Sequence, residues 1–248
     1  MTFVEPPPEY LTRADGVRLA YRYLAGDGPT IVFLPGYMSD MQGGKAQAVA
    51  AWAKANGRAM LRLDYSGCGE SDGAFEDGTL DIWRDDVLAV ISHVEPIPII
   101  LVGSSMGGWL MLLVAEASPK QVAALVGIAA APDFTDWGFT ADEKTKIIAD
   151  GKIQRPSDYG YDPMVTTRGF WQSGQANLKL ANEIAISCPV RLLHGQRDVD
   201  VPWETSVRLA EKLRSSDVQT NLLKDGDHRL SRDQDIILLI DIMAKLPV

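Results

Sequence analysis

Two serines, Ser71 and Ser105, each match the pattern Gly-x-Ser-x-Gly, a spacing that can present a serine hydroxyl as a nucleophile. Ser105 lies in GSSMGG, directly after the apolar run IPIILVG and before MGGWLMLLVAEAS, which has the composition of a helix. A strand that enters a helix through one sharp turn lifts the serine hydroxyl above the sheet. Ser71 lies in DYSGCGESDG, a turn-rich stretch with no strand or helix adjoining it. The context favours Ser105 as the nucleophile, and a tight packing turn is the alternative.

A serine hydroxyl is a weak nucleophile near neutral pH and needs a neighbouring base. The sequence contains three histidines. His93 ends a predicted helix at the far end of the sheet, and His194 lies beside a strand-ending glycine, where we expect it to fix the loop. His228, in KDGDHRLS, follows the last predicted strand and precedes the last helix. His228 is therefore the expected base.

The base is oriented by an acid, which we expect between the serine and the histidine in chain order, at the end of a strand. The stretch HGQRDVDVP supplies Asp198 and Asp200. Asp198 is favoured because the loop can turn it inward before the next helix begins. Asp200 remains a rival, since the direction of a loop side chain is not readable from sequence. Asp225 and Asp227, nearer to His228, are interpreted as turn formers.

Serine attack on a carbonyl creates an oxyanion that backbone N–H groups can stabilise. Met106, directly after the candidate nucleophile, would supply one donor. The loop after TIVFLPG would supply the other, with Tyr37 as the first choice and Met38 as the next. A close approach of this loop to the nucleophile would explain Gly36. This chemistry needs neither a metal nor a cofactor.

The elements that must position these residues alternate between predicted strands and helices. A hairpin opens the chain, and apolar strands that end in glycine alternate with stretches of helical composition. This alternation predicts an α/β fold with a mostly parallel central sheet covered by helices on both faces. Residues 133–186 break the pattern and are interpreted as a mostly helical lid over the strand ends. The lid would divide the core into residues 1–132 and 187–248.

Composition and charge narrow the possible partners and the location of the protein. The 248 residues carry a net charge of -9, which disfavours nucleic acid and anionic membrane surfaces as partners. Cys68 and Cys188 are far apart and lack zinc-ligand spacing, so we interpret both as packing residues. The start MTFVEPPPEYL has no leader-like pattern, and the apolar run near the C-terminus is broken by Asp241. No transmembrane segment and a cytoplasmic location are therefore expected.

Five blocks, taken together, resemble the serine hydrolases of the α/β-hydrolase superfamily over essentially the whole chain: LPGYMSDMQGGKA, RLDYSGCGESDG, LVGSSMGGWLML, PVRLLHGQRDVDVPWETS and DGDHRLSRDQDI. In chain order and residue sequence, these blocks are most similar to those of one group of the superfamily. This group contains the mitochondrial palmitoyl-protein thioesterase that also hydrolyses acyl glucuronides, and its bacterial relatives. The resemblance implies Ser105 as nucleophile, Asp198 as acid and His228 as base. It also implies an oxyanion hole at Tyr37 and Met106.

The resemblance implies a structural role for Ser71, because its block is a loop signature of the family. One departure is Pro35-Gly36, where many members have His-Gly. The backbone donor is retained, but a side chain that could organise the loop is absent. Because no leader is visible, the bacterial relatives are the nearer match.

The expected activity is hydrolysis of carboxylic esters or thioesters through an acyl-enzyme. The substrate would be a small-molecule ester, an acyl-thioester or an acylated protein. An acyltransferase, a carbon–carbon bond hydrolase or a cofactor-free haloperoxidase could use the same three residues, and a non-catalytic binding protein could share the fold.

Substrate contacts are less determined by the sequence. Arg229, beside the expected base, could meet a substrate carboxylate or form a surface ion pair. The lid aromatics could line an acyl pocket, or could pack the lid on the core, and Trp137 and Phe139 are the chosen substrate-binding candidates. The lid aromatics are Phe134, Trp137, Phe139, Tyr159, Tyr161, Phe170 and Trp171.

Overall fold

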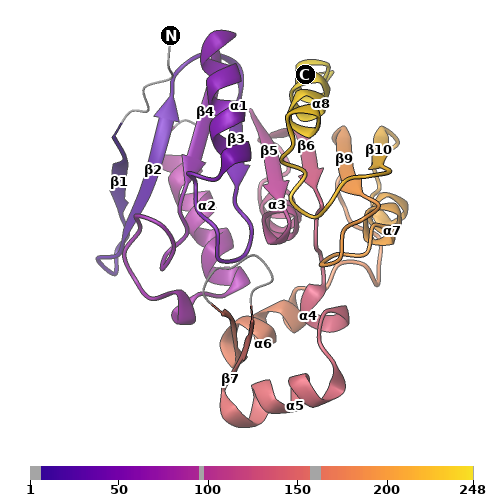
Figure 1. The fold of residues 1–248 in the computed structure, drawn as a ribbon. Helices are drawn as coiled ribbons and strands as arrows, with labels where there is room; N and C mark the ends of the chain where they lie inside the picture. The colour runs from indigo at the N-terminus through magenta and orange to yellow at the C-terminus, as the bar shows by residue number, and fades with distance from the viewer. Residues whose placement is uncertain (1–6, 95–97, 157–162, 248) are drawn as a thin grey trace.

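An eight-stranded sheet forms the centre of the protein in the computed structural model, which describes residues 7–94, 98–156 and 163–247 (Figure 1). The strand order is β1-β2-β4-β3-β5-β6-β9-β10. β1 pairs with β2, and β2 with β4, in antiparallel fashion, while the remaining neighbours are parallel. The predicted α/β class, with an N-terminal hairpin and a mostly parallel sheet, is confirmed.

The strands of this sheet are β1 (Glu9–Thr12), β2 (Arg18–Leu24), β3 (Asp27–Leu34), β4 (Arg58–Leu63), β5 (Ile99–Ser104), β6 (Val122–Ile128), β9 (Val190–Gly195) and β10 (Val218–Leu223). The core helices are α1 (Gly44–Ala55), α2 (Leu80–Val94), α3 (Met106–Ala117), α7 (Glu204–Lys212) and α8 (Asp233–Ala244), with the short 3-10 helix η1 (Phe75–Asp77).

Helices cover both faces of the sheet, because successive side chains of a strand point to opposite faces. In β3, Ile31 and Phe33 belong to the apolar cluster formed with α1 and α8. Val32 and Leu34 belong to the larger cluster formed with α2, α3 and α7. The central strands are consequently apolar on both sides, which explains their near-continuous hydrophobic runs. The free thiol of Cys68 lies in the larger cluster and that of Cys188 packs against it, which agrees with their predicted packing roles.

The segment between β6 and β9 contains α4 (Phe134–Trp137), α5 (Ala141–Asp150), β7 (Lys152–Arg155), β8 (Met164–Thr167) and α6 (Arg168–Ala176). Helices predominate as expected, but β7 and β8 pair into an antiparallel two-stranded sheet that was not predicted. Both strands have only four residues and carry few apolar side chains, so neither leaves a strand pattern in the sequence. Tyr159 and Tyr161 lie outside the described residues.

This insertion lies below the carboxyl end of the sheet (Figure 1) and contacts the core through specific hydrogen bonds. The Tyr37 hydroxyl donates to the Val165 carbonyl at 2.6 Å, and Trp109 Nε1 donates to the Asn177 carbonyl at 3.1 Å. Asp133, before α4, accepts from the amides of Lys179 and Leu180 at 2.7 and 2.8 Å. One buried carboxylate thus joins the beginning of the insertion to its end.

Candidate active site

Ser105 occupies a strained turn between β5 and α3. Its φ of 54° and ψ of -119° are sparsely populated by residues other than glycine. A Cβ on Gly103 would lie 2.3 Å from the Gly107 carbonyl oxygen, and one on Gly107 would lie 2.1 Å from that of Leu34. The flanking glycines are therefore required by close backbone contacts, and the turn holds the Ser105 side chain at the carboxyl end of the sheet.

Three side chains from distant parts of the sequence form a hydrogen-bonded series. His228 Nε2 lies 3.1 Å from Ser105 Oγ, and His228 Nδ1 lies 2.7 Å from Asp198 Oδ2. A carboxylate only accepts, so Nδ1 carries a proton and Nε2 accepts from the serine hydroxyl. The structure thus brings together the three residues that the sequence predicted as acid, base and nucleophile.

The Asp198 carboxylate is enclosed, with its side chain 0% exposed. Its Oδ1 accepts from the amides of Asp200 and Val201 at 2.9 and 2.8 Å. Burial alone would raise the pKa of Asp198, but hydrogen bonds from His194 and His228 outweigh it and hold that pKa well below its ordinary value. Asp198 is therefore ionised across the neutral range, as an orienting acid must be.

The rival acid, Asp200, is exposed and contributes its backbone N–H to Asp198. Among the described residues, Asp198, Asp200 and His228 form the one group of potential metal ligands whose atoms lie within 4.8 Å of one another. Two members of that group are already hydrogen-bonded to each other. Asp227 accepts from the Leu230 amide at 2.9 Å, which agrees with its predicted role as a turn former.

The loop after β3 packs against the serine. A Cβ on Gly36 would lie 3.4 Å from the Ser105 Cβ, so the expected close approach is present. Within the described part of the chain, the backbone N–H groups of Tyr37 and Met106 have no hydrogen-bond acceptor. The two amides predicted as oxyanion donors thus have no competing acceptor among the described residues, and their role as an oxyanion hole stays a prediction.

The substrate-binding candidates lie in different surroundings. Arg229 is half-buried, and its carbonyl accepts from the Lys45 ammonium group. Trp137 Nε1 donates to the Pro132 carbonyl at 2.8 Å. Phe139 lies under the Arg155 guanidinium, 4.3 Å from ring centroid to Cζ. The two aromatic rings thus have packing partners within the insertion, and a contact with substrate stays a prediction for all three residues.

Other predicted assignments concern Ser71 and the remaining histidines. Ser71 Oγ donates to the Asp64 carbonyl and accepts from the Ala20 amide, both at 2.8 Å, which confirms its structural role. His194 is fully buried and fixes the loop after β9, as expected. Its contact with Asp198 at 3.1 Å was not predicted. The chain turns directly after β9, where the Asp198 N–H donates to the Gly195 carbonyl at 3.3 Å, and this turn brings the two side chains together.

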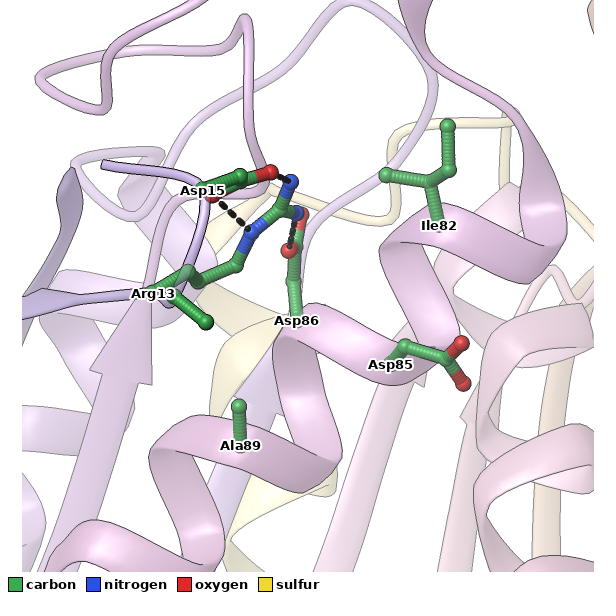
Figure 2. Close-up of a pocket in the computed structure, with 7 residues that line it drawn as sticks. Arg13, Asp15, Ile82, Asp85, Asp86 and Ala89 are labelled. Atoms are coloured by element: carbon green, nitrogen blue, oxygen red, sulfur yellow. Dashed lines mark hydrogen bonds and ion pairs between the residues drawn. The ribbon is translucent and has the colours of Figure 1, made fainter. Parts of the chain in front are cut away.

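A pocket of about 440 Å³ lies elsewhere, between the turn after β1 and the first turns of α2 (Figure 2). Arg13 bridges Asp15 and Asp86 within this pocket. Asp85, which also lines it, pairs with Arg84, which does not. The ion pair between Arg13 and Asp86 joins the N-terminal hairpin to α2. The pocket shares no residue with the hydrogen-bonded series of Ser105.

The fold and the series around Ser105 define a serine hydrolase of the α/β-hydrolase type. Residues 28–235 match the family model described as serine aminopeptidase S33 (Hydrolase_4), and the chain belongs to this family. It is 42% identical to the human palmitoyl-protein thioesterase ABHD10, mitochondrial, over 96% of this chain and 80% of that protein.

Solved structures agree with this assignment. Mouse alpha/beta hydrolase domain-containing protein 10 superposes with a TM-score of 0.90 at 41% identity, covering 96% of this chain and 97% of that one. A putative hydrolase from Agrobacterium vitis S4 gives a TM-score of 0.89 at 37% identity, covering 96% and 98%. The protein is an ester or thioester hydrolase, and the acyltransferase, haloperoxidase, carbon–carbon hydrolase and binding-protein alternatives are not favoured.

The expected cytoplasmic location is wrong by the same comparison. The curated mammalian relatives, matched over 96% of this chain, are mitochondrial proteins by name. The expectation rested on the lack of a leader-like pattern in the first residues given, and such an absence carries no cellular address. Among the described residues, no helix combines the length and the apolar character needed to cross a bilayer.

Proposed function

We propose that the protein hydrolyses fatty-acyl thioesters through an acyl-enzyme on Ser105, with His228 as base and Asp198 as the acid that orients it. The observation that carries this proposal is the continuous hydrogen-bonded series from buried Asp198 through His228 to Ser105 on its strained turn. Each contact matches what serine activation requires.

The reaction proceeds in two steps. His228 Nε2 takes the hydroxyl proton as Ser105 Oγ attacks the thioester carbonyl, and the tetrahedral oxyanion forms. His228 then returns the proton to the sulfur leaving group as the carbon–sulfur bond breaks. In the second step, water gives a proton to His228 as it attacks the acyl-enzyme carbonyl. His228 then returns this proton to Ser105 Oγ as the ester bond breaks and the carboxylic acid is released. Asp198 keeps the imidazole in one tautomer and stabilises the transient imidazolium.

The oxyanion would be received by the amides of Tyr37 and Met106. Their lack of acceptors among the described residues supports this role, because unpaired donors beside a nucleophile are preorganised for a developing negative charge. Loss of one such donor costs on the order of a hundredfold in rate.

We take the insertion, residues 133–186, as a lid over the strand ends. An acyl chain would extend from Ser105 beneath this lid. The named activity of the ABHD10 relatives supports a long acyl chain and an acylated protein as one substrate form. In this proposal Trp137 and Phe139 contact the chain from the lid. Arg229, beside His228, meets a carboxylate on the leaving group of substrates that carry one.

A fluorophosphonate probe tests the nucleophile. We expect one labelled site, lost in Ser105→Ala and retained in the neighbouring Ser104→Ala control, together with loss of thioester turnover in the first variant only. Labelling of Ser105→Ala at the wild-type rate would show that another residue is the nucleophile.

Substrate class is tested by acyl-thioesters of graded chain length, compared with p-nitrophenyl esters and an acyl glucuronide. We expect kcat/KM to rise with chain length through the long-chain range. A preference for acetyl or butyryl thioesters would contradict the proposed acyl pocket while leaving the nucleophile assignment intact.

A further inference from the structure

His194 contributes directly to the surroundings of Asp198. Its side chain is 0% exposed, and its Nε2 lies 3.1 Å from Asp198 Oδ2 and 3.1 Å from the Val201 carbonyl oxygen. Nδ1, on the other side of the ring, lies 2.7 Å from Ser206 Oγ in α7. The His194 imidazole therefore connects the loop after β9, which carries Asp198, to α7, the helix that follows this loop.

The two partners of His194 Nε2 determine which atom donates in its hydrogen bond to Asp198. A carbonyl oxygen and an ionised carboxylate both only accept, so Nε2 must carry a proton. The Ser206 hydroxyl can either donate to Nδ1 or accept from it, because a hydroxyl does both. In either protonation state of the ring, His194 donates to Asp198.

The same oxygen, Asp198 Oδ2, thus accepts from two histidines, His228 at 2.7 Å and His194 at 3.1 Å. Together with the two amides on Oδ1, four donors fill the four acceptor positions of this carboxylate. A carboxylate with every position occupied cannot rotate about its Cβ–Cγ bond without breaking several hydrogen bonds. Its orientation toward His228 is consequently determined in part by His194.

We propose that His194 is a positioning residue of the hydrolase: its Nε2–H holds Asp198 Oδ2 in the orientation that serves His228, with Ser206 supporting the far side of the ring. This inference rests on the proposed function, because it assigns His194 to the same reaction. His194 does not touch the substrate, so its loss should reduce kcat and leave KM near the wild-type value.

Two amide substitutions separate this role from simple packing. In His194→Gln the amide nitrogen has about the reach of Nε2, so donation to Asp198 can persist. In His194→Asn the amide has the reach of Nδ1 and can contact only Ser206. We expect kcat to fall about tenfold in the asparagine variant, a loss typical of a displaced catalytic group, and to recover to within about threefold in the glutamine variant. His194→Leu, which has no donor, replaces the asparagine variant if that protein does not fold.

A double-mutant cycle with Asp198→Asn tests whether His194 acts through Asp198. The fluorophosphonate labelling rate is measured for each single variant and for the pair, after thermal unfolding has shown that each is folded. We expect His194→Leu to add no further loss when Asp198 is already replaced. His93→Gln, in a helix away from this contact, serves as the control with wild-type kinetics.

The outcomes are distinguishable. Equal kcat in the glutamine and asparagine variants, or fully additive losses in the cycle, would overturn the positioning role of His194. Wild-type activity in Asp198→Asn alone would instead overturn Asp198 as the acid of the proposed mechanism, and thioester turnover retained in Ser105→Ala would overturn the proposed function.

Discussion

At the scale of single residues, the site depends on positions where only glycine fits. Gly107, in the first turn of α3, lies so close to the backbone of β3 that a methyl group would come within 2.1 Å of the Leu34 carbonyl. Gly103 is under the same constraint, since an added Cβ there would come within 2.3 Å of the Gly107 carbonyl oxygen. The strained Ser105 is held by this contact network, since strain persists only where its surroundings enforce it.

Gly107→Ala is therefore expected to destabilise the protein by about 2 kcal/mol or more, as overpacking of a rigid contact does, and to reduce turnover strongly. The matched control is Gly44→Ala at the start of α1, where an added Cβ meets nothing within 4 Å. Chemical denaturation measures both variants. Equal stabilities would show that the backbone around Gly107 can relax.

At the scale of elements, the insertion between β6 and β9, which we take as a lid, packs against the loop after β3. The Tyr37 ring lies 4.7 Å from that of Phe170 and 5.9 Å from that of Phe134, both from the insertion. Its hydroxyl donates to the Val165 carbonyl of β8. For Phe134 and Phe170, packing of the lid on the core is thus the role that the structure shows, and the loop that carries a proposed oxyanion donor is fastened to the lid.

Tyr37→Phe removes only this hydroxyl, and we expect a loss of about 1 kcal/mol, as for one hydrogen bond. Amide hydrogen exchange in β8 should accelerate, because the lid loses an attachment to the core. Tyr10→Phe, on the exposed side of β1, is the control. Unchanged exchange in β8 would mean that the aromatic cluster alone holds the lid.

At the scale of the whole molecule, Asp64 links stability to pH. It lies at the end of β4, almost fully buried, and accepts from the amides of Met41 and Glu70 at 2.7 and 2.9 Å. Burial raises its pKa to about 6 despite these hydrogen bonds. A native pKa above that of the unfolded chain means that the native state holds this proton more tightly.

This contribution to stability is fully present below the ordinary pKa of the carboxyl group and is lost as pH rises through about 6. Between pH 5 and 7 the free energy of unfolding should fall by about 1 kcal/mol through Asp64. Asp64→Asn, which cannot ionise, should lack this part of the pH dependence when both proteins are unfolded in urea at each pH. An identical pH dependence in the variant would assign the effect to other groups.

The sequence by itself determined the fold class and two residues of the hydrogen-bonded series, Ser105 and His228, and it narrowed the third to Asp198 or Asp200. Apolar runs ending in glycine and their alternation with helical stretches are local patterns, and a parallel sheet brings strand ends together wherever such patterns occur. The order Ser105, Asp198, His228 then leaves few possible partners. The same reasoning could not find β7 and β8, whose short polar strands carry no pattern of their own.

Only the tertiary structure decided between Asp198 and Asp200, because loop backbone geometry sets which carboxylate turns inward. It alone showed that His194 shares the Asp198 oxygen with His228, and that the lid attaches to Tyr37. These are contacts between side chains and segments brought together by folding. Their geometry depends on distances of a few tenths of an ångström, which a pattern of residue types does not contain.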